Sequence, residues 1–215
     1  TSDLPAVADS ARLNDALDTV GRLADDPVAV RDLVLLELLY GSGLRVGELV
    51  GLDVVASHTA RGWIDMAAAE AHVLGKGSKR RSVPVGQAAL QALEHWLQVR
   101  GPFGTLGPDM VAPAHADAAS ALFNGRNGTR LTPQAVWQRL KRRSLLSGLS
   151  TPVHPHMLRH SFASHVLQSS GDLRAVQELL GHANISTTQV YTRLDFQHLA
   201  KVYDASHPRA KLKKE

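Results

Sequence analysis

The chain has 215 residues, of which 44% are hydrophobic and 20% charged, a composition typical of folded globular proteins and not of disordered or fibrous ones. It contains no cysteine, which excludes disulfides, thiolate nucleophiles, iron–sulfur clusters and sulfur-ligated zinc. No apolar run approaches the ~18 residues needed to cross a bilayer, and no secretory signal opens the sequence. We therefore expect a cytoplasmic protein without a membrane span.

The formal net charge of +4 conceals an uneven distribution of charge along the chain. Residues 1–40 hold eight acids and three bases, whereas the other 175 residues hold twelve acids and twenty-one bases. No carboxylate occurs from Ala118 to Gly171, a stretch of 54 residues with seven Arg or Lys and four His. A solvated surface normally mixes both signs, so this stretch favours a polyanionic partner, with nucleic acid as the first candidate, over a basic solvated face.

The first half of the chain predicts three helices and a small sheet. Apolar residues recur at helical spacing over 9–23, and Pro27 opens a buried helix over 28–40 that ends at Gly41-Ser42-Gly43. A short helix begins near Leu44. Strands are predicted over 62–66, 71–74 and 81–85, the last two joined by the turn Gly75-Lys76-Gly77-Ser78, and Pro84 makes the last strand short or an edge strand.

The second half predicts helices separated by short breaks. A helix spans 87–99, a Gly/Pro loop follows at 101–107, and Thr132 caps a helix that has Pro133 in its first turn and ends near 146. Further helices are expected over 156–169, 173–180, 186–192 and 196–203. The pattern predicts an α+β fold that is mainly helical, with a small three-stranded antiparallel sheet.

Eleven histidines raise the question of a metal site. His156 and His160 are four residues apart on a predicted helix, but Met157 stands where a zinc protease carries its glutamate, and no carboxylate is near enough to complete the ligands. A structural metal is the weaker alternative. The sequence also lacks a G-x-S-x-G elbow, a Walker lysine and the third glycine of a dinucleotide-binding loop. We expect no metal ion and no cofactor.

The remaining candidates are cations and hydrogen-bond donors in separate parts of the chain. Each has a structural explanation by itself: Arg45 could pair with Glu48, Lys76 could be a solvated turn residue and Tyr191 could pack on a core. Together they meet the needs of phosphodiester transfer without a metal, since guanidinium groups stabilise phosphate charge, a tyrosine can form a covalent intermediate and a lysine can protonate the leaving oxygen. The set is Arg45, Glu48, Lys76, His156, Arg159, His182 and Tyr191.

Four runs of this sequence resemble the catalytic domain of tyrosine recombinases, the phage integrase family. They are GSGLRVGEL from residue 41, GKGSKRRSVPV from residue 75, HPHMLRHSFASH from residue 154 and LLGHANISTTQVYTRLDFQHL from residue 179. They stand in the family's order, and the likeness extends from about residue 27 to 210. Within the family the sequence is most similar to the XerC-type bacterial recombinases that resolve chromosome dimers.

The resemblance implies a role for each cation near the scissile phosphate. Arg45 and Arg159 match the arginine pair that clamps this phosphate, and Glu48 matches an acidic position that orients the clamp. Lys76 matches the hairpin lysine that acts as general acid on the 5′-oxygen. Lys79 is the alternative because the interval from Arg45 to Lys76 is longer than in similar proteins, with 57–62 as the extra loop.

The resemblance also implies the nucleophile and its helpers. Tyr191 matches the tyrosine that forms a 3′-phosphotyrosyl link and releases a 5′-hydroxyl. His156 matches the histidine that assists removal of the tyrosine proton, and His182 the second histidine, which bonds to the phosphate. His160 and His165 match the motif but no catalytic position, so we expect them to be structural or to face DNA. Another strand's 5′-hydroxyl would attack the phosphotyrosine, so strand exchange needs no ATP.

Further basic residues are candidates for DNA binding. Lys141, Arg142 and Arg143 form one basic run, which could instead complement the dipole at the C-terminal end of its helix. Met157 stands where similar proteins often have a lysine, which would remove one phosphate contact. The DNA-binding candidates are Lys79, Arg80, Arg139, Arg142 and Arg143.

The implied partners are a double-stranded recombination site, an XerD-like sister recombinase in a tetramer on DNA, and an FtsK-like DNA translocase as activator, which would place the protein at the nucleoid. We expect 1–26 to form an acidic linker and helix, 27–193 the catalytic domain and 194–215 a C-terminal helix with a basic tail, without the family's N-terminal DNA-clamp domain. The apolar stripe after residue 195 either packs on its own core or docks on a neighbouring protomer. A phage or transposon integrase, a type IB topoisomerase and a non-catalytic DNA-binding module remain as alternatives.

Overall fold

The structure is a computed structural model that describes residues 14–15, 17–18, 26–75, 80–100, 116–125, 128–146, 152–181 and 193–211. The predicted site residues Lys76, Lys79, His182 and Tyr191 lie outside these ranges, as do the expected helix over 186–192 and the loop over 101–107. Most of the helix expected over 9–23 also lies outside them, although the four described residues there are helical.

The helices expected from apolar spacing are present in the described residues. Pro27 occupies the first turn of α2, and the Asp26 carboxylate caps this helix by accepting from the Val28 N–H at 2.9 Å. Thr132 caps α6 in the same way, since its hydroxyl accepts from the Ala135 N–H at 3.1 Å. The short helix α5 has no counterpart among the predictions. The helices are α2 (Pro27–Gly41), α3 (Val46–Val50), α4 (Gln87–Val99), α5 (Ala116–Ser120), α6 (Pro133–Leu146), α7 (Pro155–Ser170), α8 (Leu173–Leu180) and α9 (Arg193–Ser206).

The sheet has four strands, in the order β1 (Leu52–Asp53), β2 (Gly62–Asp65), β3 (Glu70–Leu74) and β4 (Arg80–Pro84). Strands β2, β3 and β4 pair antiparallel, as predicted, and Pro84 ends the edge strand β4. The prediction of three strands was wrong, because β1 pairs in parallel with β2. A strand of two residues carries no readable alternation, so its formation depends on the neighbouring backbone and not on a local signal.

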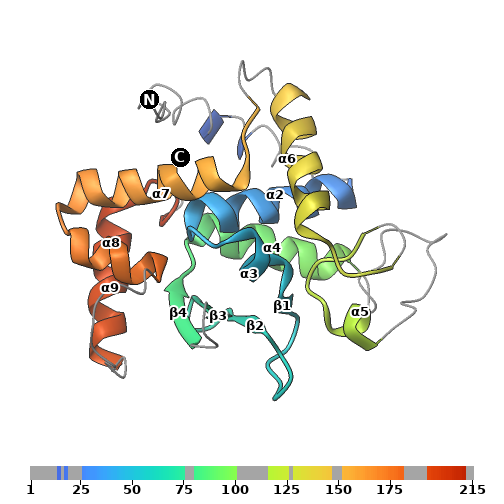
Figure 1. Cartoon of the computed structure of the whole chain (residues 1–215), viewed down its shortest axis with the longest axis horizontal. Helices are drawn as coiled ribbons and strands as arrows, with labels where there is room; N and C mark the ends of the chain where they lie inside the picture. Colours follow the sequence, from blue (N-terminus) through green and yellow to red (C-terminus); the bar gives the residue numbers. More distant parts are fainter. Residues whose placement is uncertain are drawn as a thin grey trace.

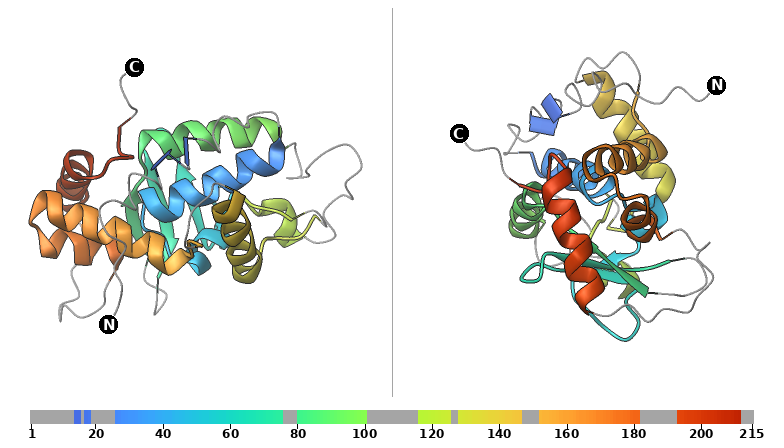
Figure 2. Two further views of the ribbon diagram at one scale, coloured as in Figure 1. Left: turned by 90° about the horizontal axis from the view of Figure 1, so that it is seen from above. Right: turned by 90° about the vertical axis from the view of Figure 1, so that its left-hand side faces the viewer.

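Helix α2 runs through the middle of the molecule and contacts both α4 and α7 (Figure 1). The view from above in Figure 2 shows α2 and α4 side by side, while α8 and α9 gather at one end of the molecule and α5 and α6 at the other. The apolar residues of α2 and α4 form one buried cluster with Val73 and Val83 of the sheet, which explains why α2 is apolar on nearly every face. None of the described helices is both long and apolar enough to cross a bilayer.

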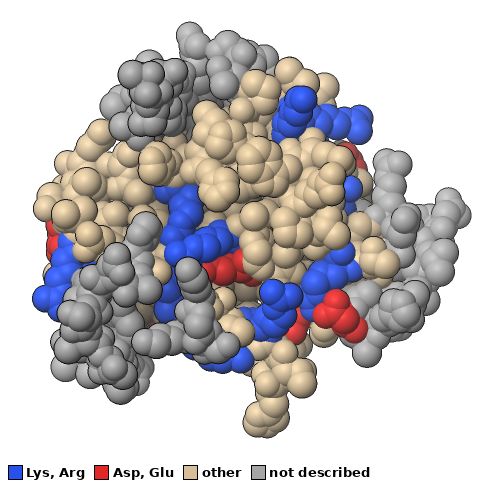
Figure 3. All heavy atoms as spheres, in the orientation of Figure 1, with Lys and Arg blue, Asp and Glu red and all other residues tan. Residues whose placement is uncertain are grey.

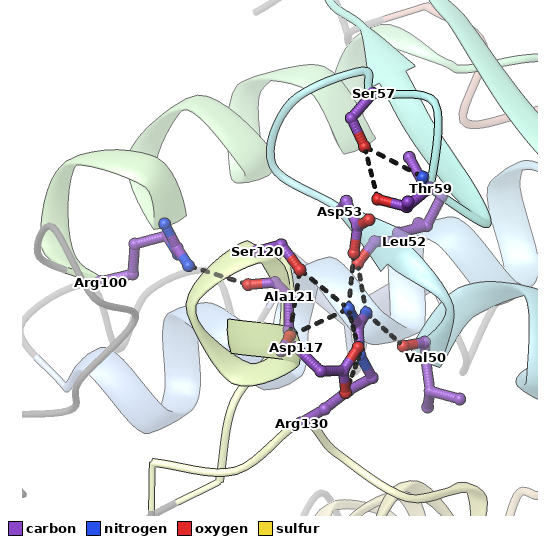
Figure 4. Close-up of polar contacts among 11 residues, drawn as sticks. Val50, Leu52, Asp53, Ser57, Thr59, Arg100, Asp117, Ser120, Ala121 and Arg130 are labelled. Atoms are coloured by element: carbon purple, nitrogen blue, oxygen red, sulfur yellow. Dashed lines mark hydrogen bonds and ion pairs between the residues drawn. The ribbon is translucent and has the colours of Figure 1, made fainter. Parts of the chain in front are cut away.

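Arg130 fastens α5 and the segment after it to the start of the sheet (Figure 4). Its guanidinium donates to the Asp53 carboxylate at 2.6 Å and to the Asp117 carboxylate at 3.0 Å. It also donates to the backbone carbonyls of Val50 and Leu52 at 3.1 and 3.0 Å. One side chain therefore binds two carbonyls at the junction between α3 and β1, of which that of Leu52 also accepts from the Leu122 N–H at 2.9 Å.

Bases of the acid-free stretch pair with acids outside it. Arg139 and Arg143 on α6 form ion pairs with Asp32 on α2, at 3.5 and 3.2 Å. Arg130 pairs with acids that also precede the stretch. The stretch is therefore not one continuous basic surface, because the chain folds carboxylates from the earlier segments against its cations.

The C-terminal helix α9 packs on its own chain. Leu199 and Tyr203 are 3% and 1% exposed and belong to a second buried cluster with Phe162 and Val166 of α7 and Leu179 of α8. These two residues of the apolar stripe therefore pack on the protein's own core, which is the first of the two alternatives for the stripe. Docking of the remaining surface of α9 on another protomer stays a prediction, as does the division of the chain at 193/194.

His207 follows α9 and is buried among aromatic rings. It is 4% exposed, lies 5.0 Å from the Tyr40 ring and stacks on the Tyr203 ring at 5.6 Å. Its Nδ1 accepts the Arg209 N–H at 3.2 Å. Burial, followed by the nearby His165 and by the Arg209 charge, lowers the pKa of His207 to about 3.

This burial predicts that acid destabilises the fold through His207. The imidazole pKa is lower in the folded than in the unfolded protein, so the stabilisation is complete above pH 6.5 and is lost as the pH falls toward 3. Each pH unit in this window costs about 1.4 kcal/mol, so unfolding should need on the order of 3 kcal/mol less at pH 4 than at pH 6.5. His207→Phe should flatten this dependence in urea unfolding series. Equal slopes for the variant and the wild type would contradict the assignment.

Candidate active site

A pocket of about 460 Å³ opens beside the N-terminal ends of α3 and α7. It brings together four residues that the sequence analysis selected from two distant segments, and it adds Arg61. The lining residues are Leu44, Arg45, Val46, Gly47, Glu48, Arg61, Leu74, Gly75, Pro155, His156 and Arg159.

Arg45 is the N-cap residue of α3 and reaches the pocket from there. Glu48, one turn later, accepts from the Arg45 backbone N–H at 2.9 Å, as in a capping box, and from the Arg45 guanidinium at 2.9 Å. The guanidinium also donates to the Gly181 carbonyl at 3.3 Å. The Arg45 side chain is still 39% exposed, so a guanidinium anchored on two sides keeps an open edge for an anion.

Arg159 is held by two backbone carbonyls from different parts of the chain. Its guanidinium donates to the Leu180 carbonyl at 2.5 Å and to the Gly43 carbonyl. Gly43 has φ +60°, and a Cβ there would overlap the Phe162 ring, so only glycine can present its carbonyl in this way. Burial first, and then the charges of Arg45 and Arg81, lower the pKa of Arg159 to about 10, against the opposing charge of Glu48. Arg159 is therefore a cation at neutral pH.

His156 is an exposed residue in the first turn of α7, one turn before Arg159. The preceding His154 caps α7, since its Nδ1 accepts the Met157 N–H at 3.3 Å. Trp137 of α6 stacks on His154 with ring centroids 4.9 Å apart and meets His156 edge-on at 6.2 Å. Burial and the neighbouring His156 lower the pKa of His154, which favours the neutral form that the cap requires.

The structure adds two cations that sequence reasoning missed, Arg61 and Arg81. Arg81 on β4 donates to both oxygens of Glu48, at 2.6 and 2.9 Å. Arg80 and Arg81 are adjacent in one basic run, so the sequence does not distinguish them. Successive residues of a strand point to opposite faces, so β4 directs the two side chains apart. Arg61 lies in the loop that the sequence analysis identified as extra, and only folding brings this loop to the pocket.

The DNA-binding candidates differ in their surroundings. Arg80 donates to the carbonyl of residue 60 at 2.7 Å and lies over the Trp63 ring at 5.1 Å. Arg139 and Arg143 pair with an acid on α2, as described above, whereas Arg142 is exposed. Lys and Arg atoms gather across the middle of the face shown in Figure 3, around a smaller acidic area. His165 is structural, since its Nδ1 lies 3.0 Å from the Tyr40 hydroxyl, and His160 is exposed.

Two of the chain's three tyrosines are buried. Tyr40 and Tyr203 are 0% and 1% exposed, and burial raises the pKa of both hydroxyls well above the usual value. A tyrosine that acts as a nucleophile must reach its substrate and lose its proton, and neither residue can do so from the core. Tyr191 is the remaining candidate.

A family model described as "Phage integrase family" matches residues 7–198, so the chain belongs to the phage integrase family. The chain is 55% identical over 194 residues to tyrosine recombinase XerC 1 of Ralstonia nicotianae, which covers 88% of this chain and 57% of that protein. It is 53% identical over 210 residues to tyrosine recombinase XerC of Pseudomonas aeruginosa, covering 98% of this chain and 62% of that protein. The chain thus spans about three fifths of the length of these curated relatives.

Two solved structures support the fold. The crystal structure of XerA recombinase matches with a TM-score of 0.64 and 26% identity, over 94% of this chain and 64% of that one. The post-cleavage complex of XerH recombinase with palindromic difH substrate matches with a TM-score of 0.60 and 25% identity, over 90% of this chain and 51% of that one. The expected fold class, a tyrosine recombinase catalytic domain, is therefore confirmed.

Proposed function

We propose that the chain is the catalytic part of a site-specific DNA recombinase that cuts and rejoins strands through a 3′-phosphotyrosyl intermediate. The observation that carries this proposal is that Arg45 and Arg159, from distant segments, line one pocket together with His156. Each guanidinium is fixed by carbonyl or carboxylate partners, and Arg45 keeps an exposed edge.

The arrangement suits a phosphodiester whose charge rises during the reaction. Guanidinium groups donate in a planar fork that matches phosphate oxygens, and fixed donors stabilise developing charge without reorganising. Glu48 is engaged by arginines, so it orients cations and does not face the phosphate as a free anion. Arg45 and Arg159 would clamp the phosphate, and the exposed His156 would assist proton removal from the nucleophile.

The remaining roles follow from the family's motif. Tyr191 would attack the phosphorus and displace the 5′-oxygen, which Lys76, or Lys79 in its place, would protonate to give a free 5′-hydroxyl. His182 would add a hydrogen bond to the phosphate. The position of His182 directly after Gly181 supports this role, because the Gly181 carbonyl already accepts from Arg45. Attack by another 5′-hydroxyl would then reverse the chemistry on a new strand.

The names of the relatives support a role in recombination, and we propose a double-stranded DNA site and, as the setting, chromosome dimer resolution at the nucleoid. A sister recombinase similar to XerD, an FtsK-like translocase and docking of α9 on a neighbouring protomer belong to the same proposal. DNA affinity should depend steeply on salt, because phosphate contacts release bound counterions.

The test is to map the residue that becomes linked to a nicked suicide oligonucleotide by mass spectrometry. An adduct on Tyr191 would support the proposal, whereas no adduct would favour a non-catalytic DNA-binding module. An adduct on Tyr40 or Tyr203 would overturn the assignment of the site. Relaxation of supercoiled plasmid without strand exchange would favour a type IB topoisomerase.

A further inference from the structure

Glu48 is held from two sides by two different arginines. Its side chain is 5% exposed, and its two oxygens accept four hydrogen bonds, two from Arg45 and two from Arg81. Arg81 provides the fork of two parallel bonds, and its own side chain is 10% exposed. The contact between Glu48 and Arg81 is therefore a partly buried, bidentate ion pair at the wall of the pocket, which Glu48 lines.

Arg81 also packs against the turn that receives both clamp arginines. Gly181 ends α8 with φ +63°, and a Cβ there would lie 2.9 Å from Cδ and Nε of Arg81. The carbonyls of Leu180 and Gly181, on this turn, accept from Arg159 and Arg45 respectively. One side chain on β4 thus touches both supports of the clamp, the Glu48 carboxylate and the end of α8.

We infer that Arg81 is a positioning residue for the phosphate clamp, acting through Glu48 and the Gly181 turn. The inference rests on the function proposed above. Arg81 is itself absent from the lining of the pocket, so it fixes the direction of the Arg45 guanidinium without touching the phosphate. The sheet is thereby linked to the clamp, because Arg81 lies on β4, where it pairs with Val73 of β3.

The protonation of Glu48 offers a readout that a purely structural role would not affect. Burial raises the pKa of this carboxyl, but the bonds and charge of Arg81, and then those of Arg45, lower it below the usual value. Arg45, Arg81 and Arg159 act on its charge, and Arg61 and His156 line the same pocket. Without Arg81, less opposes the rise in the pKa of Glu48 that burial causes. Glu48 should then take up a proton at higher pH and release Arg45.

The experiment measures single-turnover cleavage of a nicked suicide substrate by Arg81→Met, with folding checked by thermal unfolding. We expect the cleavage rate to fall about 100-fold at pH 7.5, the loss that a misplacement of about 1 Å in an active site produces. The loss should grow toward pH 5.5, whereas DNA affinity should change by only a few-fold. Arg81→Lys should fold in any case and lose about tenfold, because an ammonium cannot bond both oxygens as a fork does.

The matched control is Arg209→Met, which removes another guanidinium that is bonded to carboxylates and is 13% exposed, away from the pocket. It should lower the thermal midpoint but leave the cleavage rate of the folded protein within threefold, on the order of the variation expected for sites without shared partners. In a Glu48→Gln background, Arg81→Met should cause less than its full loss of rate, because only the contact with the Gly181 turn remains to be lost.

The outcomes separate this inference from the proposed function. If the wild type and the control form the covalent adduct and Arg81→Met and Arg81→Lys match them at both pH values, the positioning role is wrong and the function stands. Additive losses in the Glu48→Gln background would also overturn it. If the wild type forms no adduct, the function and the inference fail together.

Discussion

Tyr191→Phe is expected to abolish covalent attachment to DNA while DNA affinity stays within a few-fold of the wild type. The change removes one hydroxyl and keeps the ring, so it deletes the proposed nucleophile and little else. Denaturing electrophoresis of a nicked suicide substrate measures the adduct, and a gel shift at fixed salt measures binding. An unchanged yield of adduct would refute the assignment of Tyr191.

Tyr203→Phe is the control for this experiment. It also removes a single tyrosine hydroxyl. Tyr203, however, lies on α9, is 1% exposed and belongs to the second buried cluster. Its buried hydroxyl interacts with the Gly86 backbone, and losing one such contact should cost on the order of 1 kcal/mol, which the fold should tolerate. The variant should retain the full yield of covalent complex.

Arg159→Ala is expected to cost about 3–4 kcal/mol of transition-state stabilisation, as removal of other preorganised charge-stabilising donors does. The single-turnover cleavage rate should therefore fall by about two to three orders of magnitude. Arg159 also donates to the Gly43 and Leu180 carbonyls, so part of the loss would reflect released supports of the pocket. The test compares cleavage rates with thermal unfolding midpoints measured on the same samples.

Arg159→Lys separates the charge from the geometry. Lysine keeps the charge but cannot bond two carbonyls and a phosphate from one planar group. We expect a rate between those of the wild type and the alanine variant. A lysine variant with the wild-type rate would show that charge alone matters at this position, which would contradict the clamp geometry proposed for Arg159.

Local signals predicted most of the secondary structure. Pro27 marked the start of α2, Thr132 that of α6, and Pro84 the edge position of β4. These signals succeed because a cap or a proline acts on backbone groups within one turn. The parallel strand β1 and the helix α5 were missed because neither is long enough to show a period.

The candidate site was only partly predictable. The family's motifs selected Arg45, Glu48, His156 and Arg159, and the structure places all four at one pocket. Arg81 was missed because its importance depends on which face of β4 it occupies relative to Glu48. Lys76, His182 and Tyr191 lie outside the described residues, so their roles remain predictions.

The sequence by itself determined most of the elements of this protein, its family resemblance and the residue types available for phosphate chemistry. Only the tertiary structure decided which charges meet, as Asp32 shows by pairing with Arg143 from 111 residues further along the chain. The physical reason is the distance over which each interaction acts. Helix caps and periodicity depend on neighbours along the chain, whereas ion pairs and hydrogen bonds depend on separations of a few ångströms in space, which distant segments reach only after folding.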